Sequence, residues 1–438
     1  MVSAGTAEQL AVAQILRTID AEDRGRLLAA LATQLRDLDL AEDVLQEAMV
    51  RALETWASRG VPHNPRAWLL TVAKNQALDI IRSDAVKARR LASVPIEHQD
   101  TGGDHLDHAV RLGDELSSVN IPDERLGLFF TCSHSTLKER EKIALIMRFL
   151  AGLSTVEVAA AFLVDTRTMQ QRIVRAKKRI TTTGIPFGRP STEQLRERLP
   201  GVLRVVYLIF TQGYTPTTGS AHSRTDLQEE AIALARLLVT LVPHETEARG
   251  LLSLLLLTAS RAQARTDSAG VPVSLAEQDR RSWDSQLIAE GLSLALTAAG
   301  ETEAGPYTVQ ATIAALHAEA ATYSETDWEQ ILVLYGILSR LEPGPVVSLN
   351  RAVAMGKAKG PEAGLNALEE LAAHPGLEDY RPFHIAHALT LNELGMPEQA
   401  GRAFRKALGC LGNDAESDYI ETQIRDLLSG KALKRRSG

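Results

Sequence analysis

Apolar residues recur three and four positions apart through most of the chain, a spacing that places them on one face of an α-helix. The clearest case is segment 41–56 (AEDVLQEAMVRALETW), where the series comprises Val44, Leu45, Ala48, Met49, Ala52, Leu53 and Trp56. No run of residues shows the alternation of apolar and polar positions that is typical of a half-buried strand. The pattern therefore predicts an all-α protein.

Three stretches interrupt the helical spacing. Residues 96–121 are polar and acidic, 181–191 contain two Gly and two Pro, and 266–274 (TDSAGVPVS) have the composition of a loop. These breaks predict a chain of four segments, namely a helical module at 1–95, a flexible acidic linker at 96–121, a second helical module at 122–182 and a long helical domain at 190–438.

The second module ends in a pattern typical of a helix-turn-helix. Gly152–Asp165 (GLSTVEVAAAFLVD) predicts a helix and a tight turn, and Thr166–Ile180 (TRTMQQRIVRAKKRI) predicts the helix that follows. That second helix holds six Lys or Arg and no acidic residue, although the whole chain has a formal net charge of -7. A helix-turn-helix places its second helix in the DNA major groove, where positive charge is required. The chain is therefore expected to bind DNA through one local surface.

Charge is unevenly distributed along the 438 residues. Residues 51–90 contain eight Lys or Arg against three Asp or Glu, whereas residues 301–400 contain five against fourteen. This asymmetry favours a front half that faces nucleic acid and an acidic back half.

Nothing in the sequence predicts a bound cofactor, a metal site or a membrane span. The two cysteines, Cys132 and Cys410, lack the spacing of a zinc site and are expected to be buried free thiols. The N-terminus lacks a basic region followed by an apolar core, and the most apolar run, Gly250–Ala259, is too short to span a bilayer. We therefore expect a cytoplasmic protein with no cofactor, no metal and no membrane partner.

The first module presents two polar surfaces. In 41–56, Asp43, Gln46, Glu47, Val50 and Glu54 share the outer side of the helix, which suits either a docking surface for a basic partner or a solvated face. In 64–82, Asn64-Pro65 begins a second helix, and Lys, Asn and Arg side chains lie outside its apolar stripe. Such side chains can bind phosphates and hold the unstacked bases of single-stranded DNA.

Taken together, these segments resemble a known family. AEDVLQEAMVRALETW, then PRAWLLTVAKNQALDIIR, then a linker, then LKEREKIALIMRFLAGLSTVEVAAAFLVDTRTMQQRIVRAKKRI occur in the order and spacing of an extracytoplasmic-function (ECF) sigma factor of the sigma-70 family. The resemblance covers about residues 8–182 and implies a region 2 in the first module and a region 4 in the second. It implies a protein that binds core RNA polymerase and promoter DNA.

The resemblance assigns roles to matching residues of the first module. The polymerase-binding residues would be Asp43, Gln46, Glu47 and Arg51. The residues that recognise and melt the -10 promoter element would be Lys74, Asn75, Asp79 and Arg82, with Arg66 nearby. Asp79 could instead pair with a neighbouring Arg and be structural. The segment Ser83–Arg90 is expected to be a loop that captures an unstacked base, with Lys87, Arg89 and Arg90 on phosphates.

The helix-turn-helix resembles the part of region 4 that recognises the -35 element. The base-contacting candidates at the start of its second helix are Arg167, Thr168, Gln170, Gln171 and Arg172. Arg175, Lys177 and Lys178 lie further along and are expected to touch phosphates. Ile173 and Val174 are expected in the core or at its edge. Many family members carry a basic residue and Ser where this chain has Gln170-Gln171, so an altered -35 sequence is expected.

The residues after 190 have no counterpart in a typical ECF sigma factor. Phe383–Leu408 (FHIAHALTLNELGMPEQAGRAFRKAL) has the small-residue spacing of a tetratricopeptide (TPR) repeat, and Val346–Leu371 is a weaker copy. The chain thus also resembles an ECF subgroup that carries a C-terminal TPR-like extension. This implies a regulatory domain with a protein or peptide partner. No catalytic residues are predicted, because the HExxH, P-loop, GxSxG and Rossmann motifs are missing from the sequence.

Two functions remain open from the sequence. The first is a sigma factor, modulated by the C-terminal domain. The alternative is a stand-alone helix-turn-helix regulator with a TPR sensor domain. The first module discriminates between them, because a simple regulator needs neither a docking helix at 41–56 nor a melting helix at 64–82.

Overall fold

The computed structural model describes residues 21–92, 124–162, 164–188, 190–214, 225–267, 270–301 and 304–429. Every regular element in these ranges is a helix, and the one strand-like pairing among them is an isolated bridge between Thr266 and Pro272. The all-α prediction is confirmed. The chain divides into two compact units, Met1–Val205 and Val206–Gly438. The predicted linker at 96–121 lies outside the described residues.

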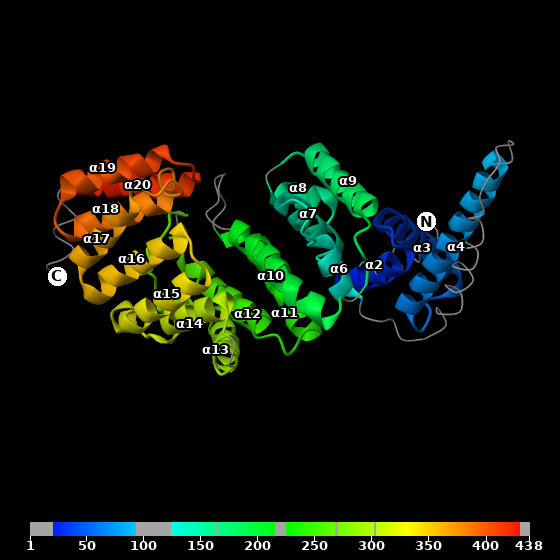
Figure 1. Cartoon of the computed structure of the whole chain (residues 1–438), viewed down its shortest axis with the longest axis horizontal. Helices are drawn as coiled ribbons and strands as arrows, with labels where there is room; N and C mark the ends of the chain where they lie inside the picture. The colour runs from blue at the N-terminus through cyan, green and yellow to red at the C-terminus, as the bar shows by residue number, and fades with distance from the viewer. Residues whose placement is uncertain are drawn as a thin grey trace, which may run out of the picture. The chain divides into compact units, whose positions relative to one another are not determined.

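The first unit consists of helices joined by loops (Figure 1). They are α2 (Ala21–Leu35), α3 (Leu38–Arg59), α4 (Pro65–Ala92), α6 (Arg125–Cys132), α7 (Glu139–Phe149), α8 (Thr155–Ala161) and α9 (Thr166–Thr183). Helix α10 (Thr192–Tyr214) runs across the division between the units. The interruption between α9 and α10 matches the Gly/Pro-rich stretch at 181–191.

Helices α2, α3 and α4 pack on one another around the predicted apolar stripe. Val44, Ala48 and Ala52 are fully buried, and Trp56 packs edge-on against Trp68 with ring centroids 5.2 Å apart. The side chain of Asp37 begins α3 by accepting hydrogen bonds from two backbone N–H groups at 2.8 and 3.1 Å. The apolar period therefore predicted the buried face of this module correctly.

One boundary in the first module was predicted wrongly. Ser83–Arg90 is not a loop, because α4 continues without a break to Ala92. The segment SDAVKARRLA contains no Gly or Pro and is rich in Ala, Lys, Arg and Leu, which are good helix formers. Lys87, Arg89 and Arg90 are thus carried on a helix, and the positions of their side chains lie outside what the structure describes.

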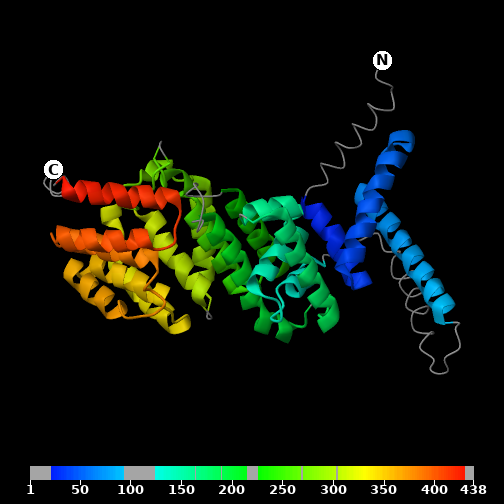
Figure 2. The same ribbon diagram turned by 90° about the horizontal axis from the view of Figure 1, so that it is seen from above.

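The second unit is a series of helices packed mainly on their neighbours along the chain (Figure 2). They are α11 (Thr225–Leu241), α12 (Thr246–Ala259), α13 (Ser285–Ala299), α14 (Pro306–Glu319), α15 (Trp328–Leu341), α16 (Pro345–Lys359), α17 (Pro361–Leu371), α18 (Arg381–Glu393), α19 (Pro397–Gly409) and α20 (Asp414–Leu428). Three 3-10 turns, at Ala262–Ala264, Arg280–Ser282 and Tyr323–Glu325, lie between them. The described residues of the predicted loop at 266–274 form no helix, as expected.

Glu247 of α12 has a structural role. Its carboxylate accepts hydrogen bonds from the backbone N–H groups of Tyr307 and Thr308, each at 2.9 Å, and from the Thr308 hydroxyl at 2.7 Å. These donors belong to the first turn of α14, where N–H groups have no helical partner and a negative charge is stabilising. Glu247 therefore fixes the start of α14 against α12.

Glycines set the distance between α16 and α17. A Cβ on Gly364 would lie 2.7 Å from the Gly356 Cα, whereas a Cβ on Gly356 would lie 3.3 Å from the Gly364 Cα. We expect Gly364→Ala to lower the free energy of unfolding by about 1–3 kcal/mol through overpacking. Gly356→Ala should lower the free energy of unfolding far less, because the gain in helix propensity offsets a smaller clash. Urea denaturation of both variants checks this; equal effects would contradict the asymmetry.

The half-buried His317 is expected to make the stability of the second unit sensitive to acid. The His317 ring stacks edge-on against Trp328 at 5.1 Å, and burial, followed by Arg261 and Arg280, lowers its pKa from 6.5 to about 4. The unfolded chain therefore binds this proton at a higher pH than the folded chain. The contribution of His317 to the free energy of unfolding is fully present above pH 6.5 and is lost as the pH falls toward 4.

We expect the wild-type protein to lose up to about 3 kcal/mol more unfolding free energy than His317→Gln between pH 7 and pH 4. Urea denaturation at several pH values measures this difference. His374→Gln, which changes an exposed histidine, is the control and should follow the wild type. A parallel loss in wild type and His317→Gln would contradict the assignment.

Candidate polymerase and DNA interfaces

The four predicted polymerase-binding residues lie on the surface of α3. Asp43 and Gln46 are exposed, and the side chains of Glu47 and Arg51 are 45 % and 51 % exposed. Glu47 and Arg51 are one turn apart, with Nε and Oε1 separated by 3.5 Å. An exposed ion pair of this kind contributes little to stability, so these side chains are available to a partner. Val50, 49 % exposed, adds an apolar contact to the same face.

Three candidates for the -10 element lie on one side of α4, and a fourth lies on the opposite side. Asn75, Asp79 and Arg82 are exposed and follow one another at helical spacing along α4. Asp79 and Arg82 lie 3.9 Å apart, in accord with the structural alternative for Asp79. Arg66 lies on the opposite side of α4 from Asn75. Its guanidinium pairs with the carboxylate of the buried Asp23 of α2 at 2.5 Å.

Lys74 lies at the edge of this stripe and is half-buried. Burial lowers the pKa of its ammonium group. Among the described residues, no carboxylate forms an ion pair with Lys74. A partly desolvated cation without a counter-ion favours a phosphate partner more than a fully hydrated one does.

The helix-turn-helix is present as predicted. Ser154 begins α8 with a capping box, in which its hydroxyl accepts from the Glu157 N–H at 3.2 Å and the Glu157 carboxylate accepts from the Ser154 N–H at 2.6 Å. Asp165 begins α9 by accepting from the Thr168 N–H at 2.8 Å and from the Thr168 hydroxyl at 2.6 Å. The Thr168 hydroxyl is therefore engaged in helix capping.

The inner face of α9 consists of Met169, Ile173, Ala176 and Ile180, all buried. Its outer side exposes Arg167, Thr168, Gln170, Gln171, Arg175 and Lys178. Arg172 is half-buried, and burial, followed by the neighbouring Arg140, lowers the pKa of its guanidinium. The amide, cationic and hydroxyl groups predicted for DNA binding thus lie mainly on the side that faces away from the core.

One residue of this exposed face was placed wrongly from the sequence. Ile173 is 5 % exposed as expected, but Val174 is 55 % exposed and lies one turn after Gln170. Its helical phase, the same as that of Gln170 and Gln171, could have indicated this. An exposed apolar side chain among amides suits contact with a thymine methyl group.

Two of the six cations on α9 are used within the protein. Arg179 pairs with Glu141 at 3.2 Å and donates to the Thr136 carbonyl at 3.3 Å. Lys177, predicted to contact phosphate, is only 11 % exposed and pairs with Asp39 and Glu42 of α3. Arg167, Arg175 and Lys178 remain exposed to a polyanion.

The described residues contain neither a metal-binding arrangement nor a membrane-length apolar helix. No group of three or more His, Cys, Asp or Glu in these ranges could hold a metal ion. No helix there is long and apolar enough to cross a bilayer. Cys132 and Cys410 are free and buried, and burial raises the pKa of both thiols.

Comparison with known proteins agrees with the structure. Residues 21–86 match sigma-70 region 2 and residues 130–180 match sigma-70 region 4. Residues 198–299 match a family of unknown function (DUF6596). The first match contains most of the α2–α4 module, and the second contains the helix-turn-helix.

Relatives fall into two groups. The uncharacterized protein R00370 of Rhizobium meliloti (strain 1021) is 42 % identical over 93 % of this chain and 95 % of its own length. The ECF RNA polymerase sigma factor SigK of Mycobacterium sp. (strain KMS) is 27 % identical over 34 % of this chain and 72 % of its own length. SigX of Bacillus subtilis (strain 168), also an ECF sigma factor, is 27 % identical over 38 % of this chain and 77 % of its own length. The chain therefore belongs to the ECF-type sigma-70 factors, in one family with R00370, with which it shares the helical part that follows region 4.

Proposed function

We propose that the protein binds core RNA polymerase and directs it to promoters, with α3 as the docking helix, α4 at the -10 element and α9 at the -35 element. The observation that carries this proposal is the exposed row of Asp43, Gln46, Glu47 and Val50 on α3. A DNA-binding regulator that acts alone has no need of this surface, because α9 already supplies the contacts to DNA.

We expect the side chains of α4 to stabilise melted promoter DNA. Asn75 and Arg82 present hydrogen-bond donors along one exposed stripe, and Lys74 adds a cation. Binding of unstacked bases and of single-strand phosphates there would stabilise the open duplex. On this account opening needs no nucleotide hydrolysis, and the protein is not an enzyme. Lys87, Arg89 and Arg90, further along the same helix, would extend the phosphate contacts.

Transcription with purified components tests this proposal. DNA fragments selected by the complex of core polymerase and full-length protein should yield transcripts that start at one position downstream of a shared -35 and -10 pair. Asn75→Ala should reduce duplex opening more than it reduces binding of the closed duplex. Selection of DNA by the protein alone, without transcripts when polymerase is present, would favour the stand-alone regulator.

We further propose that the second unit is a TPR-like domain that binds a protein or peptide and modulates initiation. Successive helices that pack on one another through short connections, and the close approach at Gly356 and Gly364, support the TPR-like assignment. A chain that ends after Tyr214 retains all of α10, including the Arg198 side chain, which donates to the Phe130 carbonyl at 2.6 Å. Its transcription from the selected promoter should differ from that of the full chain; identical activity and regulation would contradict modulation.

A further inference from the structure

Two arginines of the second unit lie against one tryptophan. Arg261 follows α12 at a distance of two residues, Arg280 begins the 3-10 turn at Arg280–Ser282, and Trp283 comes directly after that turn. The guanidinium carbons of Arg261 and Arg280 lie 5.8 Å and 4.7 Å from the centroid of the Trp283 ring. Among the described residues, no Asp or Glu forms an ion pair with either arginine. The arrangement therefore concentrates positive charge that lacks a direct counter-ion.

Backbone carbonyls hold the side chain of Arg280. Its guanidinium donates to the His317 carbonyl and, at 2.6 Å, to the Ala320 carbonyl, both at the end of α14. Carbonyls at the C-terminus of a helix carry only a partial negative charge. Glu325 attracts Arg280 from beyond ion-pair distance, but burial, followed by the positive charge of Arg261, lowers the pKa of the Arg280 guanidinium. Arg280 therefore remains undercompensated.

Arg261 adds to the same positive field. Its side chain donates to the Tyr214 hydroxyl at 2.7 Å, which is its one hydrogen bond within the described part of the chain. Burial acts to raise the pKa of the Tyr214 phenol, but Arg261 and Arg265 outweigh burial and hold this pKa below its usual value. A buried phenol has a lowered pKa only where positive charge dominates its surroundings.

Two nitrogen atoms of this cluster are buried without a hydrogen-bond partner. Trp283 is 6 % exposed, and its indole N–H has no acceptor among the described residues. Nδ1 of His317, on α14, is in the same situation. A buried polar group without a partner costs about 1–3 kcal/mol, so such a group suggests a partner that the chain does not supply.

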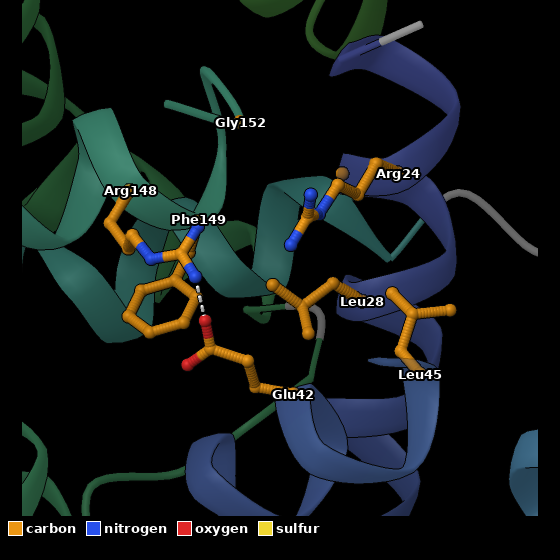
Figure 3. A pocket seen from close by; sticks show the side chains of 8 residues that line it. Arg24, Leu28, Glu42, Leu45, Arg148, Phe149 and Gly152 are labelled. Carbon is orange, nitrogen blue, oxygen red and sulfur yellow. Dashed lines mark hydrogen bonds and ion pairs between the residues drawn. The ribbon is translucent and has the colours of Figure 1, made fainter. Parts of the chain in front are cut away.

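A pair of arginines in the first unit shows the contrast. Arg24 and Arg148 line one pocket together with Glu42, and the Glu42 carboxylate pairs with Arg148 (Figure 3). Burial and the charge of Arg148 lower the pKa of Arg24, whereas Glu42 acts in the opposite direction. The charge of those arginines is thus offset within the protein. Arg261 and Arg280 have no such carboxylate in the described ranges, so solution is the remaining source of a counter-charge.

We propose that Arg261 and Arg280, held beside Trp283, bind the phosphate group of a small molecule. A phosphate monoester carries a charge of about -1.5 to -2 at pH 7, which matches two guanidinium groups better than the single charge of a carboxylate does. Planar guanidinium groups also suit the spacing of phosphate oxygens. The site belongs to the second unit and is independent of the proposed function, because phosphate binding can be measured without polymerase or DNA.

Equilibrium dialysis of full-length protein against labelled inorganic phosphate tests the site, in chloride buffer of constant ionic strength. We expect saturable binding of one phosphate per chain. Arg261→Gln should weaken this binding at least about tenfold, because it removes a charge-assisted contact. Arg281→Gln is the matched control: Arg281 is the next residue after Arg280, its side chain is 91 % exposed, and it pairs with Asp279. This control should bind phosphate like the wild type.

Thermal unfolding distinguishes a binding role of Arg261 from a structural one. Arg261→Gln removes repulsion from Arg280, so without phosphate the variant should unfold at the same temperature as the wild type or at a higher one. Phosphate should raise the unfolding temperature of the wild type but not that of the variant. Should Arg261→Gln fail to fold, Arg261→Lys keeps the charge and should bind phosphate several-fold more weakly than the wild type, because it lacks the planar fork.

Competitors identify the source of the phosphate group. Displacement of labelled phosphate by glycerol 3-phosphate at lower concentration than by unlabelled phosphate would indicate a phosphorylated metabolite, and the reverse order would indicate free phosphate; both support the site. Displacement by a single-stranded oligonucleotide alone would place the phosphate on a nucleic-acid surface and overturn the proposal. The absence of saturable binding at millimolar phosphate, or equal affinity in wild type, Arg261→Gln and Arg261→Lys, would also overturn it.

Discussion

Reversal of two charges on α3, in the variant Asp43→Lys/Glu47→Lys, should weaken binding to core RNA polymerase about 100-fold or more. Each close charge pair at a protein interface is worth about 1.5 kcal/mol or more, and reversal adds repulsion to the loss of attraction. Neither residue is needed for the fold, because Asp43 is exposed and the Glu47–Arg51 pair is a surface contact. Binding of labelled full-length variants to core polymerase measures the effect.

Glu193→Lys/Glu197→Lys is the control for this variant. These residues are also exposed carboxylates one turn apart, on α10, and their reversal changes the net charge by the same amount. The control should bind polymerase like the wild type at the same ionic strength. Equal weakening by both double variants would mean that net charge, and not the α3 face, governs association.

Substitutions on the outer side of α9 should separate recognition of sequence from attraction to phosphate. Gln171→Ala should cost about 1–3 kcal/mol of discrimination at one base pair of the -35 element, because a Gln amide can bond an adenine edge in two places. Lys178→Ala should weaken binding similarly on all sequences and reduce the slope of affinity against salt by about one.

Binding of the polymerase complex to a set of -35 variants, at several salt concentrations, measures both effects. Thr182→Ala is the control, because it changes an exposed side chain on the last turn of the same helix. If Gln171→Ala weakens binding to all -35 variants equally, Gln171 does not contact a base. If Lys178→Ala changes sequence preference without changing the salt slope, the assignment of Lys178 to phosphate is wrong.

The helices and their buried faces could be predicted from the sequence because both depend on local periodicity. Val44, Ala48 and Trp56 are buried where the spacing places them, and α8 and α9 form the predicted helix-turn-helix. The family resemblance predicted a loop at Ser83–Arg90, whereas the local absence of Gly and Pro lets α4 continue through these residues.

Contacts between distant segments could not be predicted in this way. Nothing near Lys177 in sequence distinguishes it from Lys178, yet one is 11 % exposed beside Asp39 and the other is exposed. The difference arises because α9 packs against α7 and brings one side of its cationic surface toward α3. Such a pairing depends on the tertiary arrangement, which composition and spacing do not encode.

Association with core RNA polymerase is the most direct test of whether this chain is a polymerase specificity subunit. Full-length protein should co-migrate with core RNA polymerase as a stoichiometric complex, and the complex should initiate at a promoter that core polymerase alone does not use. Tight binding of promoter DNA by the free protein, with no complex formed between full-length protein and core polymerase, would contradict this assignment and favour a regulator that acts alone.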